Sequence, residues 1–200
     1  NVGTTPTTST YTVTTTSNGC TSTDAVDVIV NPLATANAGP AQTICAGSTA
    51  TLAGAVGGAA TSGTWGGGAG AFTPNNNTLN AVYTPSAAEV AAGSVTLTLV
   101  SNDPAGPCPV ATSTVTITIN PVATIDAGAD QTTCIGGSIT LAGITGGGAT
   151  SGTWSGGTGT FAPNNTTANA VYTPSAAEEA AGTVTLTYTS DDPAGPCPSV

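Results

Sequence analysis

The sequence repeats itself after 89 residues without a gap, and this repeat constrains the fold more than any other feature. Residues 34–111 laid over residues 123–200 give 53 identities in 78 positions. The same shift places Cys45 on Cys134, Cys108 on Cys197 and Trp65 on Trp154. Segments this similar share one fold, so the chain is expected to be an array of small domains built on one plan.

The composition excludes most catalytic and nucleic-acid chemistry. The chain has no Lys, Arg or His, and ten acidic residues give it a net charge of -10. Without His or Lys it can form no Ser–His pair, imidazole metal site or Schiff base, so we predict that it is not an enzyme. Nucleic acids and anionic membranes recruit basic residues, so neither is expected as a partner. No apolar run approaches the ~20 residues that cross a bilayer, so no membrane insertion is expected.

Alternating apolar residues indicate β-strands rather than the disorder that a chain rich in Gly, Thr and Ser suggests. Residues 95–99 and 115–119 both place apolar side chains at every second position, on one face of a strand. About seven short strands in about 90 residues predict an all-β fold of tandem immunoglobulin-like β-sandwiches. We expect the strands at 42–45, 49–53, 63–65, 71–72, 80–84, 95–101 and 112–119. The expected core aromatics are Trp65, Phe72 and Tyr83 and their counterparts Trp154, Phe161 and Tyr172.

One segment of each repeat predicts a short capped helix. Ser86 precedes an Ala-rich run that has Glu89 at its third position and ends at Gly93. Ser with Glu three residues later is a capping box, and a closing Gly suits a left-handed C-cap.

The repeat also predicts the domain boundaries. Asn31-Pro32 matches Asn120-Pro121 at the same shift. We therefore expect 1–33 to be the closing strands of a preceding repeat, 34–122 a complete repeat, and 123–200 a repeat that lacks its final strand. The connection over 119–126 contains Pro and β-branched residues, which favours an extended linker and an elongated array. Alternatively, the strand at 23–30 completes a neighbouring molecule and builds a head-to-tail fibre by strand addition.

Each repeat carries two cysteines at the same spacing. Intradomain disulfides Cys45–Cys108 and Cys134–Cys197 are the simplest interpretation. Cys20 is then unpaired within these residues, because its expected disulfide partner lies in a preceding repeat. Disulfides imply an oxidising, extracellular location. A metal site is the rival interpretation, but the chain lacks close Cys-x-x-Cys spacing and His.

Several successive motifs resemble one family of repeats. These are Thr-Trp-Ser-Gly-Gly-Thr-Gly-Thr-Phe (153–161), Asn-Ala-Val-Tyr-Thr-Pro-Ser-Ala-Ala-Glu (169–178), Asp-Asp-Pro-Ala-Gly-Pro-Cys (191–197) and Asp-Ala-Gly-Ala-Asp-Gln-Thr (126–132). Together they resemble the Ig-like or PKD-like repeats of giant Bacteroidetes cell-surface adhesins, of the SprB gliding-motility type. That resemblance implies export by type IX secretion and display as cell-surface filaments used in gliding motility or cell adhesion.

The candidate ligand sites are few. Asp126 and Asp130 at the linker, with Asp103 or Asp192 in the Cys loop, are weak calcium candidates, because hard cations favour carboxylate oxygens. No other cofactor is expected. The Gly-rich stretch 66–70 lacks the Lys of a phosphate-binding loop, so a tight turn is the better interpretation.

The sequence therefore predicts a stalk and adhesin segment of a secreted cell-surface filament protein. Its expected partners are neighbouring repeats, an external surface or polysaccharide, and, in a fibre, further copies of itself. A carbohydrate-binding module is a second hypothesis, in which Trp65, Trp154 or Tyr83 would be exposed and stack on sugar rings. An accessory region of a secreted hydrolase is a third.

Overall fold

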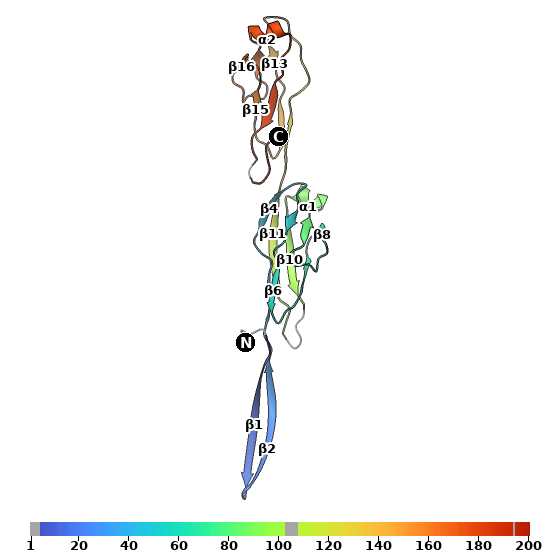
Figure 1. Ribbon diagram of the computed structural model, residues 1–200, viewed down its shortest axis with the longest axis vertical. Helices are drawn as coiled ribbons and strands as arrows, with labels where there is room; N and C mark the ends of the chain where they lie inside the picture. Colours follow the sequence, from blue (N-terminus) through green and yellow to red (C-terminus); the bar gives the residue numbers. More distant parts are fainter. Residues whose placement is uncertain (1–4, 103–107, 194) are drawn as a thin grey trace. The chain divides into compact units, whose positions relative to one another are not determined.

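The computed structural model describes residues 5–102, 108–193 and 195–200. The chain divides into two compact units, residues 1–42 with 49–117 and residues 43–48 with 118–200. Both units are built from β-strands joined by loops, with one six-residue helix in each, which confirms the all-β prediction (Figure 1). We use first repeat for residues 34–122 and second repeat for residues 123–200; these boundaries remain a prediction from sequence.

The N-terminal part of the first unit is a long β-hairpin. Strands β1 (Thr7–Ser17) and β2 (Cys20–Val30) pair antiparallel over their whole length, with Thr7 opposite Val30 and Ser17 opposite Cys20. Asn18 and Gly19 join them with φ of 50° and 80°, the two positive angles that a type I′ turn requires. Every residue of both strands is exposed. Cross-strand pairing places Tyr11, Val13, Val26, Val28 and Val30 on one face, which we call the apolar face, whereas Ile29 lies on the other.

The first repeat contains three antiparallel groups of strands. Its elements are β3 (Ala34–Asn37), β4 (Gln42–Cys45), β5 (Ala50–Thr51), β6 (Ala55–Gly58), β7 (Gly63–Gly66), β8 (Ala71–Thr73), β9 (Val82–Thr84), α1 (Ala87–Ala92), β10 (Ser94–Ser101) and β11 (Thr112–Asn120). They form a four-stranded sheet of order β4-β11-β10-β7, a three-stranded sheet of order β5-β9-β8 and the pair β3-β6. The sheets bury side chains between them as a β-sandwich does, with Trp65, Leu99 and Ile117 from the first sheet and Tyr83 from the second.

The second repeat reproduces most of this plan. Its elements are β12 (Ala123–Asp126), β13 (Ile139–Thr140), β14 (Ile144–Gly147), β15 (Gly152–Ser155), β16 (Thr160–Ala162), β17 (Val171–Thr173), α2 (Ala176–Ala181) and β18 (Thr187–Ser190). They pair as β12-β14, β13-β17-β16 and β15-β18.

Two segments of the second repeat differ from their counterparts in the first. Residues 131–134, the counterparts of β4, and residues 183–186, the counterparts of the first half of β10, lie outside the described strands. In the first repeat β11 lies between β4 and β10, and β7 pairs only with residues 98–101 of β10. The described part of the second repeat has no strand in the place of β11, so both segments lack the ladder that would hold them extended.

The predicted helix caps are confirmed in α1. The Ser86 hydroxyl accepts from the Glu89 amide, the Glu89 side chain accepts from the Ser86 amide, and Gly93 closes the helix at φ 75°. Helix α2 repeats the arrangement with Ser175, Glu178 and Gly182. A six-residue helix has too few internal hydrogen bonds to be stable alone, so these caps and the packing of its ends determine where it forms.

The predicted aromatic core is confirmed for the Trp and Tyr residues. Trp65, Trp154, Tyr83 and Tyr172 are each at most 1% exposed. Phe72 and Phe161 are only half-buried and pack against the two Tyr rings at tilts of 54° and 52°, with ring centroids 4.8 Å apart in both repeats. The prediction missed Tyr188, which replaces the buried Leu99 of the first repeat and stacks on Trp154 at 4.5 Å.

Candidate functional site

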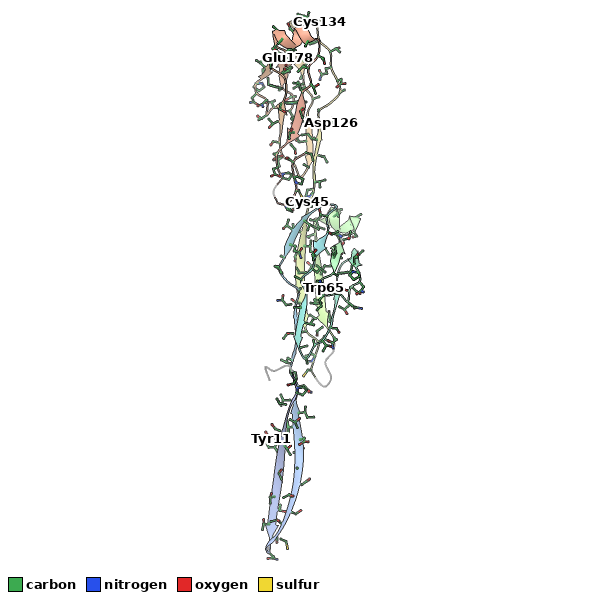
Figure 2. All side chains as sticks on the ribbon, viewed as in Figure 1. Tyr11, Cys45, Trp65, Asp126, Cys134 and Glu178 are labelled. Atoms are coloured by element: carbon green, nitrogen blue, oxygen red, sulfur yellow. A yellow bond between two sulfur atoms is a disulfide. The ribbon has the colours of Figure 1, made fainter. Side chains whose placement is uncertain are left out.

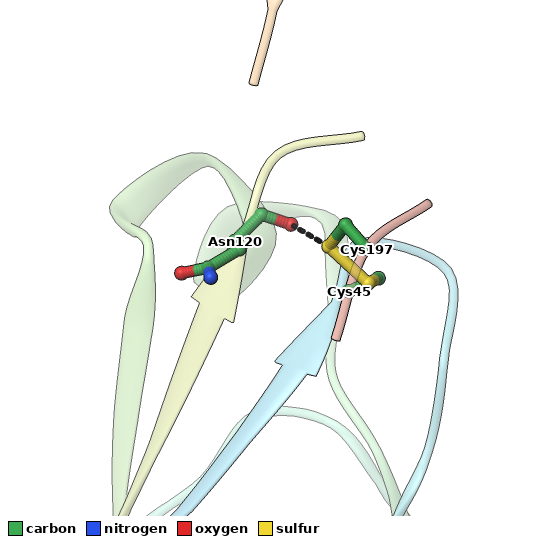
Figure 3. The surroundings of a disulfide bond; sticks show 3 residues. All are labelled: Cys45, Asn120 and Cys197. Carbon is green, nitrogen blue, oxygen red and sulfur yellow. Dashed lines mark hydrogen bonds between the residues drawn. A yellow bond between two sulfur atoms is a disulfide. The ribbon is translucent and has the colours of Figure 1, made fainter. Parts of the chain in front are cut away.

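The candidate site is the disulfide between Cys45 and Cys197, which lies inside the second unit (Figure 3). Cys45 ends β4 and belongs to the first repeat, whereas Cys197 belongs to the second. Their Cα atoms are 5.4 Å apart, which is the usual spacing for a disulfide. The bond therefore connects one repeat covalently to the next and closes a loop over a sequence separation of 152 residues.

This pairing contradicts the predicted pairs Cys45–Cys108 and Cys134–Cys197. Cys45 lies beside the C-terminal end of β11, because the Ala46 amide donates to the Asn120 carbonyl at 2.8 Å. Cys108 precedes the N-terminal end of β11, a strand of nine residues that spans ~30 Å. The two cysteines of one repeat thus lie at opposite ends of a strand, too far apart to bond. A pairing offset by one repeat has the same periodicity, which is why the spacing alone misled the prediction.

The Asn-Pro motif between the repeats forms the support for this disulfide. The carbonyl oxygen of Asn120 accepts from the Ala46 amide and lies 3.9 Å from the Cys197 sulfur. Gly195 packs against the Asn120 side chain, and a Cβ at Gly195 would lie 2.4 Å from Asn120 Nδ2. Its φ of 103° also suits glycine alone. One Asn therefore fixes the approach of both half-cystines.

The remaining three cysteines, Cys20, Cys108 and Cys134, carry free thiols. The surroundings of Cys108 match those of Cys197, since its sulfur lies 3.9 Å from the carbonyl oxygen of Asn31. Asn31 is the counterpart of Asn120 at the shift of 89 residues. The first unit therefore repeats the contact between Cys197 and Asn120, but Cys108 carries a free thiol where Cys197 forms a disulfide.

Cys134 lies at the edge of an open groove in the second unit. The groove has a volume of about 590 Å³, and the residues that line it include Leu141, Trp154, Val184 and Leu186. Val184 and Leu186 are half-buried, whereas their counterparts Val95 and Leu97 are 8% and 0% exposed. In the first repeat, β11 pairs with β10 and supplies the buried side chains Val115, Ile117 and Ile119. Within the described residues, the groove thus lies where β11 packs in the first repeat.

The Gly-rich loops bind a carboxylate of the same repeat rather than an external anion. Glu89 accepts from the Ala69 amide at 2.7 Å and from the Tyr83 hydroxyl at 2.7 Å, in addition to its capping contacts. A Cβ at Gly68 would lie 2.1 Å from the Tyr83 hydroxyl oxygen, so the loop passes too close to the ring for a larger residue. Glu178 and Tyr172 form the same contact in the second repeat. The loop, the buried Tyr and the helix cap are one hydrogen-bonded structural unit.

Hydrogen bonding in this unit shifts the pKa values of its members. Burial and the hydrogen bond to Glu89 raise the pKa of Tyr83 to about 12. Desolvation acts to raise the pKa of Glu178, but the bonds from Ser175, Thr158 and Tyr172 outweigh it and lower that pKa to about 2. The pKa of Glu89 is lowered for the same reasons, with Ser86 as the main hydrogen-bond donor. Both carboxyl groups are therefore ionised, structural acceptors at neutral pH.

Asp191, in the loop that follows β18, has a structural role. Asp191 accepts from the amides of Thr150 and Ser151 at 2.9 and 3.1 Å and so holds the loop between β14 and β15. Asn102 makes the equivalent contacts to Thr61 and Ser62 in the first repeat. An amide can replace the carboxylate in this role, which explains why the acid is not reproduced between repeats.

The calcium candidates do not come together in the described chain. Asp126 and Asp130 are exposed, and Asp126 accepts from the Gly128 amide at 2.8 Å within its own turn. Asp192 is exposed, and Asp103 lies outside the described residues. Among the residues that the structure describes, no three Cys, Asp or Glu side chains gather as a metal site would require. Calcium binding remains an untested prediction.

The aromatic residues proposed as a sugar platform are buried. Trp65, Trp154 and Tyr83 are at most 1% exposed, and the indole N–H groups of the two Trp residues donate to the carbonyls of Leu79 and Ala168. They cannot stack on a sugar ring, so this form of the carbohydrate-binding hypothesis is wrong. The exposed aromatic side chain of the hairpin is Tyr11, at 61% (Figure 2).

Comparisons with known proteins support the fold. No protein-family model matches the sequence, and neither does any curated protein. Among solved structures, the N-terminal eight immunoglobulin domains of Down syndrome cell adhesion molecule match with a TM-score of 0.55 at 16% identity. That match covers 94% of this chain and 30% of the other. The extracellular domain of protocadherin gamma B4 matches with a TM-score of 0.43 at 12% identity, over 84% of this chain and 34% of the other. The first of these matches and the strand arrangement described above show an all-β protein with the immunoglobulin-like fold.

Proposed function

We propose that this chain is a load-bearing segment of an extracellular stalk that provides reach and surface attachment, and that it acts mechanically rather than as an enzyme. The Cys45–Cys197 disulfide carries the proposal, because it joins successive repeats covalently. Small domains with few large aromatic residues are held together by modest cores, and covalent cross-links stabilise them against unfolding.

The position of the disulfide gives the stalk a specific mechanical property. Residues 46–196 lie within the closed covalent loop. Tension applied to the two ends of the chain therefore passes through the two sulfur atoms and not through the residues of the loop. If a repeat unfolds under load, the part of it that lies between Cys45 and Cys197 cannot extend. The bond therefore limits the length of the segment as long as the surroundings are oxidising.

An extracellular location is part of this proposal. The disulfide favours an oxidising compartment, and the described helices include none that could span a membrane. The matching immunoglobulin domains belong to a cell adhesion molecule, which agrees with a role in adhesion. We extend the proposal to filaments of the gliding-motility adhesins that type IX secretion exports in Bacteroidetes; this extension rests on the repeat motifs alone. An external surface or polysaccharide is the proposed target.

Single-molecule pulling tests the stalk directly. Stretching the reduced chain should release ~500 Å more contour length than stretching the oxidised chain, since each residue in the loop adds ~3.4 Å. Cys197→Ser should extend like the reduced chain under oxidising conditions, and Cys20→Ser, which leaves the disulfide intact, should extend like the oxidised parent. Equal extension of the oxidised and reduced chains would contradict the proposed load path.

A further inference from the structure

Three segments of the chain match the acceptor pattern for N-linked glycans, which is Asn-x-Thr with any residue except Pro in the middle. They are residues 76–78, 164–166 and 165–167. All three lie in equivalent loops, the first between β8 and β9 and the other two between β16 and β17. The pattern alone does not separate the three Asn residues. The structure does, because it shows what each Asn side chain already contacts.

Two of the three Asn side chains bind the backbone of a neighbouring strand. The side-chain nitrogen Nδ2 of Asn165 donates to the Trp154 carbonyl at 3.0 Å, and the Trp154 amide donates to the Asn165 carbonyl at 2.8 Å. Asn76 makes the same two contacts with Trp65, at 3.1 and 2.8 Å. A sugar on either Nδ2 would have to fit between the loop and a strand whose Trp side chain is 1% exposed. Neither Asn is therefore suited to carry a glycan in the folded protein.

Asn164 is exposed, and the Thr of its own pattern orients its side chain. The side-chain oxygen Oδ1 accepts from the Thr166 amide at 3.1 Å, from the Thr166 hydroxyl at 2.8 Å and from the Thr167 hydroxyl at 3.0 Å. Three donors around one atom identify it as the oxygen of the amide, so Nδ2 is the end turned away from the two Thr residues. The turn thus presents Asn164 Nδ2 at the surface and keeps Thr166 beside it.

We propose that Asn164 is the acceptor of an N-linked glycan. The donor is an oligosaccharide on a diphosphate carrier lipid, and an oligosaccharyltransferase performs the transfer. Nδ2 bonds to the anomeric carbon of the sugar as the bond from that carbon to the diphosphate breaks. The diphosphate leaves with the electron pair, and a proton of Nδ2 passes to a base of the transferase. The inference goes beyond the stalk and rests on the extracellular location in the proposed function, because these transferases act on exported chains.

The first repeat has the same turn without the acceptor pattern. Asn75 Oδ1 accepts from the Asn77 amide at 3.0 Å and from the Thr78 hydroxyl at 3.2 Å. Asn77 stands where the second repeat has Thr166, so Asn75 has no hydroxyl two residues later. Asn75 is as exposed to solvent as its counterpart Asn164, since both are surface residues. The inference therefore assigns a glycan to the second repeat and none to the first.

The test is transfer in vitro to the folded, oxidised 200-residue chain. A lipid-linked oligosaccharide is the donor, and the enzyme is a purified oligosaccharyltransferase that is active on a short Asn-x-Thr peptide. The mass of the chain should rise by one oligosaccharide. Enzymatic release of the glycan converts the linked Asn to Asp, and peptide mass spectrometry should find this change at Asn164.

The overlap of two patterns in one loop provides a matched pair of variants. Thr166→Ala removes the pattern at Asn164 and leaves the pattern at Asn165 intact, so transfer should be lost. Thr167→Ala does the reverse, so transfer should equal that of the parent chain. Each variant removes one hydroxyl that donates to Asn164 Oδ1, so both alter the loop to a similar extent.

A gain of function in the first repeat completes the design. Asn77→Thr places a hydroxyl two residues after Asn75, in a turn that already has the geometry of the Asn164 turn. This variant should gain two glycans per chain, the second of them on Asn75.

Three results would overturn the inference: a glycan on Asn165 or Asn76, equal transfer to Thr166→Ala and Thr167→Ala, or a parent chain that gains no glycan. If the same samples contain the Cys45–Cys197 disulfide, the stalk proposal stands without the glycan, because the load path depends on the sulfur atoms alone. Absence of that disulfide would contradict the stalk, whichever Asn carries the glycan.

Discussion

Removing the Glu89 carboxylate should destabilise the first unit strongly, although the side chain is only half-buried. In Glu89→Ala, the capping box is lost, which costs about 1 kcal/mol. The Tyr83 hydroxyl, on a residue that is 0% exposed, still accepts from the Gly70 amide but loses the acceptor for its own proton, and an unsatisfied buried donor costs about 2 kcal/mol. The sum is about 3 kcal/mol, or a fall of about 15 °C in the unfolding midpoint of a domain of this size.

The assay is thermal unfolding of the oxidised chain by calorimetry, with Trp fluorescence as a second probe. Tyr83→Phe distinguishes the cause. It removes the acceptor of the Gly70 amide in either background, but only in the parent does it also break the bond to Glu89, so it should cost clearly less in the Glu89→Ala background than in the parent. Glu179→Ala is the control, since that carboxylate accepts from the exposed Gly136 amide and holds no buried hydroxyl. A loss below about 0.5 kcal/mol in Glu89→Ala, or equal costs of Tyr83→Phe in both backgrounds, would refute the reasoning.

Two further predictions concern pH and packing. The pKa of Glu178 is lowered from its ordinary 4.5 to about 2, so its contribution to stability is complete above pH 4.5 and is lost as the pH falls towards 2. The pKa of Tyr83 is raised from 10.0 to about 12, so its contribution is complete below pH 10 and is lost as the pH rises towards 12. Urea unfolding across both pH ranges, with Glu178→Gln and Tyr83→Phe as controls, should show these two losses, and a flat profile in either range would contradict the assignment. Gly54→Ala should destabilise the first unit by about 2 kcal/mol because its Cβ would lie 2.7 Å from the Trp65 ring, whereas Gly66→Ala, with nothing within 4 Å, should be neutral in the same urea titration. Equal midpoints for the two Gly variants would count against the packing account.

The parts of the fold that depend on local signals could be predicted from sequence. The Ser86–Glu89 capping box and the strands at 95–101 and 112–119 were recognisable because their residues interact with near neighbours or alternate at a strict period of two. Strands β3 and β6 were missed, since they consist mostly of Ala, Gly and Thr and carry no apolar alternation. Their pairing, from Ala34 opposite Gly58 onward, depends on close approach of the two backbones.

The candidate site could be predicted only in part. The repeating cysteines predicted that disulfides form, but a strict repeat allows Cys45 to bond either within its own domain or to the next one. The distinction depends on which end of β11 each cysteine occupies, and that follows from how β4 and β11 pair in space. The one early signal was Asn31-Pro32 matching Asn120-Pro121, which marks the junction that supports the bond.

Disulfide mapping of the oxidised monomer tests the central claim most directly. The chain lacks Lys and Arg, so it would be cleaved at its acidic and aromatic residues, and the linked peptides would be identified by mass spectrometry before and after reduction. The account predicts a linked pair that contains Cys45 and Cys197, with Cys20, Cys108 and Cys134 free to react with a thiol reagent. Recovery of Cys45–Cys108 together with Cys134–Cys197 would contradict it, because each repeat would then be closed on itself and no covalent bond between side chains would join one repeat to the next.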